Sequence, residues 1–495
     1  MIDINVSKEV LVIGTGSTGL AASEKIAALG YKVTSIPFAS DNDAGAVNLE
    51  RVLGCTGDFK ADLTQKGKRT TTTFGAIVAA PEYTKEAMNK EYGLKLDDKV
   101  VTQTKFDEML ETDAGIKGLV NGKGSSVAFV SGYGQESCPE NAEKILKAAQ
   151  KVQSLDQCNA YIFVKNVKVG APGLEKLFTS ARHDGVLCFK PEIKPEFNQS
   201  SKELVIKSFE PVIREEMEFS PDYIVIEESL KPNEKTNALK TILRIDTDFD
   251  GFYQSNNVHR FPVMTNRLGV YVAHTTGDAT NIALRIKDLL GNGTIQAPED
   301  QGVVDPEKCV LCLTCYRCCP HGAIFWDNEA AIISSVACQG CGICASECPM
   351  DAIQIKGFAD TSMKENVDKA VDSKKAIVVF CCENSALPAY NTAKILGNDL
   401  PENIRVVHIP CAGKVDVEFI WQSLVNGAAG VVVAACHEGN CKSEKGNTYA
   451  SWRFGEIAKR LETIGINQGK IGFINIASNM AGDFTKKINE FAQKL

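Results

Sequence analysis

Short apolar runs rich in β-branched residues alternate with amphipathic stretches over the first 300 residues. The runs have the length and composition of buried strands, and several stretches between them repeat apolar residues at helical spacing. The expected strands cover residues 10–13, 32–36, 75–80, 126–132, 160–167, 203–207 and 223–227, and the expected helices cover 20–30, 141–152 and 173–182. This alternation predicts an α/β fold whose mostly parallel sheet is covered on both faces.

A glycine-rich turn joins the first expected strand to the first expected helix. Its glycines are Gly14, Gly16 and Gly19. They provide a tight turn, close approach of a pyrophosphate to backbone N–H groups, and close helix packing. Strand, glycine turn, helix and strand together predict a dinucleotide-binding unit of the Rossmann type. Two interpretations of the unit stay open, a bound flavin and a scaffold without a ligand.

Two further positions bear on a flavin. The second strand of such a unit usually ends at an acidic residue that binds the ribose hydroxyls. Here that place falls at Pro37, and the next acids are Asp41 and Asp43. Asp278 stands at a turn before a helical stretch. Its carboxylate fits two roles, an acceptor for a ribityl hydroxyl of a flavin and an N-cap for the helix that follows.

Most cysteines are concentrated in one region, since 14 of the 18 lie between Cys309 and Cys441. In a reducing cytosol, clustered thiols indicate metal or redox chemistry rather than disulfides. The remaining four are expected to be small buried hydrophobic residues. They are Cys55, Cys138, Cys158 and Cys188.

Two consecutive motifs of the form C-x-x-C-x-x-C-x-x-x-C-P predict two [4Fe–4S] clusters. This is the spacing of bacterial two-cluster ferredoxins, in which the fourth cysteine of each motif binds the other cluster. The first predicted ligand set, set A, is Cys309, Cys312, Cys315 and Cys348. The second, set B, is Cys338, Cys341, Cys344 and Cys319. Zinc is the rival interpretation, and eight thiolates in this crossed arrangement argue against it.

Within these motifs Cys318 breaks the spacing and is expected to be spare, and His321 is expected at the surface. Residues 322–326 and 351–358 are expected to form strands that shield the clusters. Their burial and N–H···S bonds would tune the cluster potentials.

A second α/β pattern follows, with strands expected at residues 376–380, 404–410, 430–436 and 470–477. All but the last strand end at cysteines, at the edge where open α/β sheets hold their ligands. Four thiolates there predict a [2Fe–2S] centre. The predicted ligands, set C, are Cys382, Cys411, Cys436 and Cys441, with Cys381 as the substitute for Cys382. A zinc site and a redox-active disulfide remain alternatives.

Composition and charge exclude several classes of protein. Hydrophobic residues make up 44% and charged residues 23% of the chain, which is ordinary globular composition. The net charge of −8 argues against nucleic acid or an anionic membrane as the main partner. No apolar run reaches the roughly 18 residues of a membrane span, and the N-terminus carries no export signal. We expect a cytoplasmic protein without direct membrane insertion, with peripheral attachment to a membrane complex as the alternative.

The expected fold class is α/β in three parts. Residues 1–300 form a Rossmann-like region of the FAD/NAD(P)-binding type, with a break near residue 120 into two subdomains. Residues 301–358 form a two-cluster bacterial ferredoxin-like α+β insert. A polar linker over 359–374 leads to a small C-terminal α/β domain over 375–495.

Several stretches resemble known families. Residues 1–358 resemble the A subunit of heterodisulfide reductase in VLVIGTGSTGLAASEKIAALGYKV, SSVAFVSGYG, NAYIFVKNVKVGAPGLEKLFTSAR, FPVMTNRLGVYVAH and the ferredoxin-like pair. Residues 376–453 resemble the delta subunit of methyl-viologen-reducing hydrogenase in FCCENSALPAY, HIPCAGKVDVEFI and AACHEGNCKSEKGN. The fusion is similar to the B-type subunit of quinone-interacting oxidoreductase complexes.

The resemblance implies cofactors and partners. In that family the A subunit binds FAD, which bifurcates electrons in some members, and the delta subunit relays electrons from a hydrogenase or formate dehydrogenase. It therefore implies a hetero-oligomer with subunits like heterodisulfide reductase B and C, or with a hydrogenase, formate dehydrogenase or reductase. This chain departs from the pattern at Pro37, at 80–82 (Ala-Pro-Glu in place of Ala-Thr-Gly) and at 227–229 (Glu-Glu-Ser).

Two functions follow as hypotheses. The first is an iron–sulfur electron-transfer subunit that relays electrons between a donor and a partner catalytic subunit, since no catalytic constellation for an organic substrate is evident. The second is an FAD-dependent oxidoreductase that binds its flavin at Gly14, Gly16, Gly19 and Asp278. A redox or iron sensor would need a DNA-binding or signalling element, and the sequence shows none.

Overall fold

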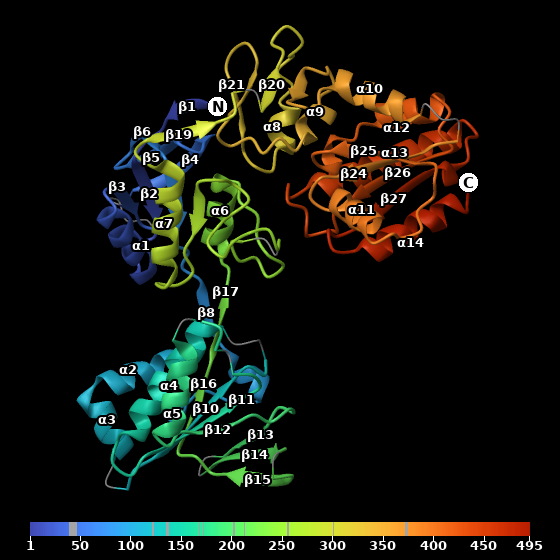
Figure 1. The fold of residues 1–495 in the computed structure, drawn as a ribbon. Helices are drawn as coiled ribbons and strands as arrows, with labels where there is room; N and C mark the ends of the chain where they lie inside the picture. Colours follow the sequence, from blue (N-terminus) through green and yellow to red (C-terminus); the bar gives the residue numbers. More distant parts are fainter. Residues whose placement is uncertain are drawn as a thin grey trace. The chain divides into compact units, whose positions relative to one another are not determined.

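The computed structural model describes residues 1–38, 47–120, 123–134, 138–167, 169–171, 173–200, 203–211, 213–254, 257–299, 301–371 and 375–495. The chain forms two compact units, drawn in Figure 1. Unit 1 comprises Met1–Glu82 and Glu234–Leu495, and unit 2 comprises Tyr83–Asn233. The expected break near residue 120 therefore differs from the observed division, because unit 2 is an insertion and residue 120 lies within it.

The N-terminal part of unit 1 is built on a parallel sheet. Its strand order is β18 (Val270–Val272), β7 (Ala76–Ala79), β2 (Glu9–Ile13) and β3 (Lys32–Ile36). Because side chains alternate along a strand, β2 presents Val10 and Val12 to one face and Leu11 and Ile13 to the other. The apolar run at the start of the sequence is thus a central strand buried on both sides.

Different layers cover the two faces of that sheet. One face packs against α1 (Ser17–Ala28) and α7 (Asp278–Leu290). The other packs against the antiparallel strands β4 (Asn48–Cys55), β5 (Asp58–Gln65) and β6 (Lys68–Phe74) and against α6 (Glu234–Leu243). A separate antiparallel pair joins β1 (Ile2–Asn5) to β19 (Thr294–Ala297).

Unit 2 repeats this architecture. Its five-stranded parallel sheet has the order β12 (Leu187–Phe189), β11 (Asn159–Val164), β10 (Ser126–Ser131), β16 (Tyr223–Ile226) and β9 (Val100–Thr102). One face carries α2 (Gln103–Glu111), α3 (Asp113–Val120), α4 (Pro139–Gln153) and α5 (Leu174–His183). The other carries η1 (Met88–Tyr92) and the antiparallel strands β13 (Glu196–Gln199), β14 (Leu204–Glu210) and β15 (Glu215–Phe219). The strand expected at 203–207 is therefore β14 and lies outside the parallel sheet. A further pair joins β8 (Thr84–Ala87) to β17 (Glu228–Lys231).

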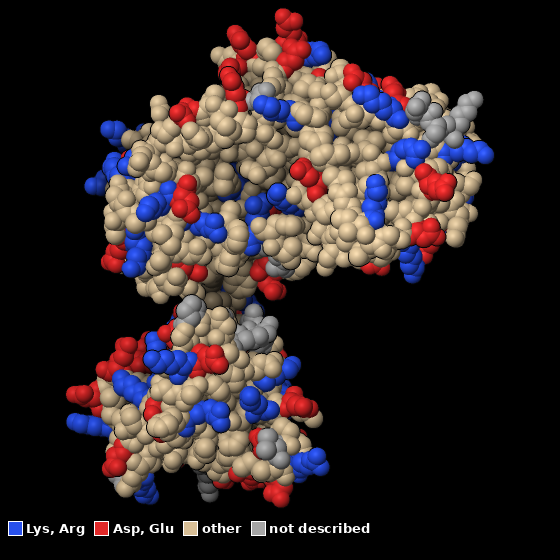
Figure 2. Space-filling model, viewed as in Figure 1, with Lys and Arg blue, Asp and Glu red and all other residues tan. Residues whose placement is uncertain are grey.

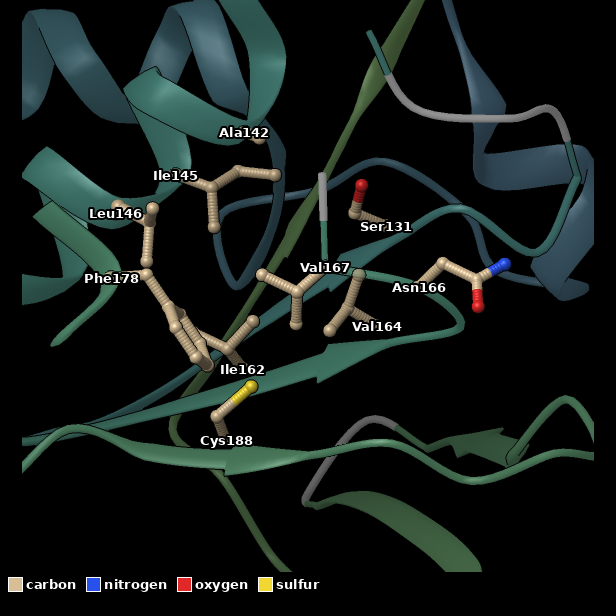
Figure 3. A pocket seen from close by; sticks show the side chains of 10 residues that line it. All are labelled: Ser131, Ala142, Ile145, Leu146, Ile162, Val164, Asn166, Val167, Phe178 and Cys188. Atoms are coloured by element: carbon tan, nitrogen blue, oxygen red, sulfur yellow. The ribbon is translucent and has the colours of Figure 1, made fainter. Parts of the chain in front are cut away.

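A small cavity lies on the helical face of unit 2, shown in Figure 3. Ile145 and Leu146 of α4 and Phe178 of α5 line it together with Ile162 and Val164 of β11. Its volume of ≈ 30 Å³ is far below the several hundred Å³ of a typical ligand pocket. The cavity is a gap in side-chain packing and leaves no room for a nucleotide.

The ferredoxin-like region of unit 1 consists of short elements. One antiparallel pair is β20 (Gly302–Val304) with β23 (Ile353–Ile355), and the other is β21 (Ile324–Trp326) with β22 (Ala331–Ile333). The helices are α8 (Thr314–Cys318) and α9 (Ile343–Ser346). Each of the two segments expected to shield the clusters contains one strand, β21 in residues 322–326 and β23 in residues 351–358. Each of these strands pairs with a strand outside the expected segments.

The C-terminal part is a doubly wound parallel sheet. Its strand order is β25 (Ile404–Ile409), β24 (Ile377–Cys382), β26 (Gly430–Ala435) and β27 (Ile471–Asn475). One face packs against α10 (Asp360–Ala370), α12 (Val417–Val425) and α13 (Gly446–Thr463), and the other against α11 (Ala386–Ile395) and α14 (Ala481–Ala492). Two 3₁₀ turns, η2 (Ala412–Lys414) and η3 (Gln468–Lys470), complete it.

The segment expected as a linker over 359–374 is mostly structured. Residues Asp360–Ala370 form α10, and its Met363, Val367 and Ala370 are buried in the core of the C-terminal part. These apolar positions stand three and four residues apart, so one face of a polar helix packs against the sheet. Residues 372–374 lie outside the described part of the chain.

The distribution of surface charge and the hydropathy of the helices add little to the description of the fold. On the face shown in Figure 2, Lys and Arg side chains are interspersed with Asp and Glu side chains over both units. Among the described residues, no helix combines the length and the apolar character needed to cross a bilayer.

Candidate metal centres

The four cysteines of set A lie together. They line one cavity of ≈ 20 Å³ that is bounded by residues of β20, β23 and α8. The backbone N–H groups of Ala331 and Ala352 donate to the sulfur atoms of Cys309 (3.5 Å) and Cys348 (3.4 Å). Cys312 is the exposed member of the set. The fold thus joins the first three cysteines of one motif to the last cysteine of the other.

Set B lies deeper in the same region. Cys341 and Cys344 are buried, and the N–H of Gly340 donates to the sulfur of Cys338 at 3.5 Å. Burial raises the pKa of Cys344, and the other three thiols of the set raise it further. Thiols in such an environment resist ionisation unless a metal neutralises the thiolates. Set B is therefore a group of thiols that stay protonated in the absence of a neutralising charge.

Two residues within the motifs were expected to have no role. The thiol of Cys318 is buried and donates to the carbonyl oxygen of Cys315 at 3.4 Å. The expectation of a surface position for His321 is wrong, since its side chain is buried and burial lowers its pKa to about 4. Asn266 donates to the carbonyl of Pro320 at 2.8 Å and holds this turn against the N-terminal part.

Four cysteines lie outside the cysteine-rich region and were expected to be buried. Cys55 and Cys158 are buried, and Cys138 and Cys188 are half-buried.

Set C gathers at the carboxyl end of the C-terminal sheet. Cys382 ends β24, Cys411 follows β25, Cys436 follows β26, and Cys441 lies in the loop before α13. All four are buried. The sulfur atom of Cys382 lies 3.8 Å from that of Cys436, and the sulfur atom of Cys411 lies 3.9 Å from that of Cys441. Hydrogen bonds also join Cys382 to Cys411 and Cys436 to Cys441, so the four thiols form one connected group. The strand ends therefore bring four thiols from three loops into one group.

Cys381 faces away from this group. Adjacent residues of a strand point to opposite faces of its sheet. Cys381 packs with Ala386 and Phe484 in the core on the α11 and α14 side, whereas Cys382 packs with Cys411 and the other thiols. The geometry favours Cys382 over Cys381 as a member of set C.

Side-chain amides fix the loops that carry set C. Asn447 and Asn475 donate to the carbonyl oxygen of Cys436 at 3.1 and 2.7 Å, and Asn257 donates to that of Cys441 at 2.6 Å. Hydrogen bonds from the thiols of Cys411 and Cys436 lower the pKa of Cys441. The side-chain amides and these thiols together hold the loops of set C in place.

Sets B and C share one buried core. At their junction α9 meets η2 so closely that a Cβ at Gly342 would lie 2.7 Å from Cβ of Lys414. A Cβ at Gly413 would likewise lie 2.5 Å from Ile343. The hydroxyl of Ser346 donates to the carbonyl of Lys414 at 2.8 Å. The backbone of each glycine thus packs against a side chain of the other segment between the two groups of cysteines.

The glycine turn of the N-terminal unit is explained largely by packing. A Cβ at Gly14 would lie 2.4 Å from the carbonyl oxygen of Ala80, and one at Gly19 would lie 2.0 Å from that of Gly14. Gly16 is exposed and precedes α1 without a side-chain cap, and a Cβ there would meet only a carboxylate oxygen of Glu82, at 3.2 Å. Packing therefore accounts for two of the three glycines, and a carboxylate of the chain itself lies beside the third.

The other predicted flavin contacts are less favourable. Asp278 accepts from the N–H groups of His274 (3.0 Å) and Thr275 (2.8 Å), so its carboxylate bonds the turn before α7. The N-cap interpretation is wrong, since Gly277 occupies that position without a side-chain bond. Pro37 follows β3 where an acid would bind the ribose. Asp41 and Asp43 lie outside the described residues.

A carboxylate of the chain itself fills the corresponding turn of unit 2. Glu227, at the end of β16, accepts from the N–H of Gly132 (2.6 Å) and the hydroxyls of Ser131 (2.7 Å) and Tyr92 (3.1 Å). These donors surround the carboxyl ends of β10 and β16, where open α/β sheets bind ligands. The carboxylate of Glu227 thus bonds the turn after β10 to the end of β16.

Comparisons with known proteins bear on both ends of the chain. Residues 377–495 match the family described as methyl-viologen-reducing hydrogenase, delta subunit, and residues 331–354 match the 4Fe-4S binding domain family. The iron-sulfur D subunit of the F420-non-reducing hydrogenase of Archaeoglobus profundus is 35% identical over 115 residues, which cover 23% of this chain and 84% of that protein.

Most of the chain matches a longer protein. The A subunit of the ferredoxin/F(420)H(2)-dependent CoB-CoM heterodisulfide reductase of Methanosarcina acetivorans is 26% identical over 473 residues. The match covers 90% of this chain and 59% of that relative, so the chain spans about three fifths of its length. The crystal structure of T. acidophilum thioredoxin reductase is 13% identical and covers 57% of this chain and 99% of its own, with a TM-score of 0.34.

The predicted resemblance is confirmed in both parts, over 90% of the chain and over the C-terminal domain. A four-iron binding domain stands between them. The chain is a homologue of the A subunit of heterodisulfide reductase, and its residues 377–495 belong to the family of methyl-viologen-reducing hydrogenase delta subunits.

Proposed function

We propose that this chain is the iron–sulfur electron-transfer subunit of a heterodisulfide reductase-like complex, placed between an electron donor and a partner catalytic subunit. The observation that carries the proposal is the grouping of twelve cysteines into sets A, B and C, of which all but Cys312 and Cys338 lie in or against one buried core. Iron–sulfur centres supply one-electron chemistry. The relatives are subunits of heterodisulfide reductases and hydrogenases, and the proposed partners are subunits of that kind.

The proposed ligands follow the crossed pairing. Set A holds one [4Fe–4S] centre and set B the other, because the cysteines of each set lie together and receive backbone N–H bonds at sulfur. The burial of the two sets differs, since Cys312 of set A is exposed whereas Cys341 and Cys344 of set B are buried. Set A is therefore the side that is open to a partner.

Set C is proposed to hold a [2Fe–2S] centre. Two sulfur ligands of one tetrahedral metal ion, with bonds of about 2.3 Å, lie about 3.8 Å apart. Two sulfur–sulfur distances in set C, 3.8 and 3.9 Å, match ligands of one metal ion. Four thiols at the carboxyl end of a parallel sheet fit two irons with bridging sulfides, and zinc is the alternative that metal analysis tests.

Metal analysis tests the proposal directly. The anaerobically purified chain is expected to contain about ten irons and about ten acid-labile sulfides, from two four-iron centres and one two-iron centre. Electron paramagnetic resonance (EPR) of the dithionite-reduced chain is expected to show all three. Stoichiometric zinc with about eight irons would refute the assignment of set C, and a colourless, iron-free preparation would refute the function.

A flavoprotein is the second candidate, and the strand, glycine turn and helix formed by β2 and α1 favour it. Gly14, Gly16 and Gly19 would hold the pyrophosphate of FAD there. FAD would supply two-electron chemistry. The ribose position at Pro37 and the carboxylate of Glu82 beside Gly16 do not assist such binding. FAD is therefore placed second, and no step of the proposed function depends on it.

Flavin analysis separates the two candidates. Acid extraction of the anaerobically purified chain is expected to release well below one FAD per chain, because the ribose contact is missing and a carboxylate faces the phosphate site. A Glu82→Gln variant, reconstituted with FAD under the same conditions, is expected to bind more flavin than the wild type. Stoichiometric FAD in the wild-type chain would establish the flavoprotein instead.

The proposed location is the cytoplasm. A reducing compartment keeps the cysteines available as thiols for metal binding. The proposed assembly is a hetero-oligomer, since a chain that only transfers electrons needs a protein surface at both ends of its path.

A further inference from the structure

Arg267 carries a buried positive charge in the N-terminal part of unit 1. Its side chain is 3% exposed. The guanidinium donates to the carbonyl oxygens of Leu243 (2.6 Å) and Gly54 (3.0 Å) and lies 5.4 Å from the ring centre of Phe59. All three contacts are with neutral groups, so none of them balances the charge.

Three other cations of unit 1, one buried and two half-buried, have a carboxylate partner. These ion pairs are Arg260 with Glu444, Arg453 with Glu347 at 2.7 Å, and Lys414 with Asp360. Within the described ranges, no Asp or Glu forms such a pair with Arg267. A buried charge without a counter-charge is costly. The site therefore requires an anion that the side chains around it do not supply.

Set B lies next to this guanidinium. A Cβ added at Gly322, three residues beyond Cys319, would lie 2.6 Å from Nε of Arg267. Cys55 packs against both Cys319 and Cys338 of set B, and its thiol also interacts electrostatically with Arg267. The side chain thus reaches from the N-terminal part to the wall of the proposed metal centre.

The charge state of Arg267 follows from the same surroundings. Burial, followed by the neighbouring charge of Arg244, lowers the pKa of Arg267 to about 10, and Cys319 acts in the opposite direction. The guanidinium therefore remains positively charged at neutral pH.

We propose that Arg267 is the counter-charge of the [4Fe–4S] centre held by set B and that it raises the midpoint potential of this centre. The inference rests on the proposed function. Four thiolates outweigh the positive charge of the iron–sulfur core, and one-electron reduction adds one more negative charge while Arg267 keeps its proton. A positive charge in a low-dielectric site stabilises the more negative form, and net charge and environment set the potentials of such centres.

The inference is tested by redox titration of the full chain, purified without oxygen and reduced stepwise with dithionite while EPR is recorded. Arg267→Gln removes the charge and keeps a hydrogen-bond donor. We expect the midpoint potential of one of the two four-iron signals to become more negative and the other to stay unchanged. Arg267→Lys keeps a positive charge and is expected to restore most of the wild-type potential.

Two further variants make the test specific. Arg317 is exposed and donates to the carbonyl of Cys312 in set A at 3.0 Å, so Arg317→Gln should leave the set B signal unchanged. Arg244 stacks on the ring of Tyr316 at 4.1 Å and is half-buried, so Arg244→Gln should shift the set B signal in the same direction as Arg267→Gln, by less. If Arg267→Gln does not fold, Arg244→Gln tests the same inference.

Several outcomes would overturn the inference. The first is an unchanged midpoint potential of the set B centre in an Arg267→Gln chain that retains its full iron content. The second is an equal shift of this potential in Arg267→Gln and Arg267→Lys, since equal shifts would indicate that Arg267 acts through packing. A more positive potential in Arg244→Gln would have the same meaning. Failure of the proposed function is recognised separately, because the wild-type chain would then lack the two four-iron signals.

Discussion

Cys319→Ala is expected to remove one complete four-iron centre, whereas Cys318→Ala leaves all centres in place. The two cysteines are adjacent, and both lie among the thiols of the ferredoxin-like region. Only Cys319 has the spacing of a motif's fourth cysteine, and it packs against Cys338 of set B. The thiol of Cys318 instead donates to the carbonyl of Cys315.

The expected loss in Cys319→Ala is about four of about ten irons per chain. It should appear in iron and acid-labile sulfide analysis, and as the loss of one four-iron EPR signal. Cys338, Cys341 and Cys344 would remain without a metal, the last two of them buried in the core that set B shares with set C, so this variant should also unfold at lower denaturant concentration. An equal loss of iron from Cys318→Ala would contradict the assignment of set B.

The cysteine groups could be predicted from the sequence because their geometry is local. Three ligands of each ferredoxin-like set come from one short stretch, and the spacing itself encodes the exchange of Cys319 and Cys348. Set C could be predicted because parallel strands end at one edge of a sheet, and Cys382, Cys411 and Cys436 each follow a strand. In both cases short-range patterns determine which side chains meet.

The parts that escaped prediction depend on tertiary packing. Strands β7 and β18 are neighbours in one sheet although the whole of unit 2 lies between them in the sequence, so no local pattern marks the insertion. Helix α10 did leave a signal, since Met363, Val367 and Ala370 repeat at helical spacing within a polar segment. The burial of His321 and Arg267 left none, because a single polar residue takes its environment from distant segments.

Cys382→Ala is expected to abolish the two-iron centre, and Cys381→Ala is its matched control. The two residues are consecutive in β24 and point to opposite faces of the C-terminal sheet. The sulfur of Cys382 lies 3.8 Å from that of Cys436, so its removal takes one of the four thiols out of set C. Cys381 packs on the other face with Ala386 and Phe484.

The two variants should therefore lose different properties, one the iron centre and the other a little stability. Cys382→Ala should lose about two irons per chain and the two-iron EPR signal. Cys381→Ala should keep both and lose about 1 kcal/mol of unfolding free energy, as is usual when a small buried side chain is trimmed. Because set C shares its core with set B, the four-iron signals of Cys382→Ala report whether the two centres are structurally independent. Loss of the two-iron signal from Cys381→Ala instead would place Cys381 among the ligands and require β24 to be turned over relative to the geometry described.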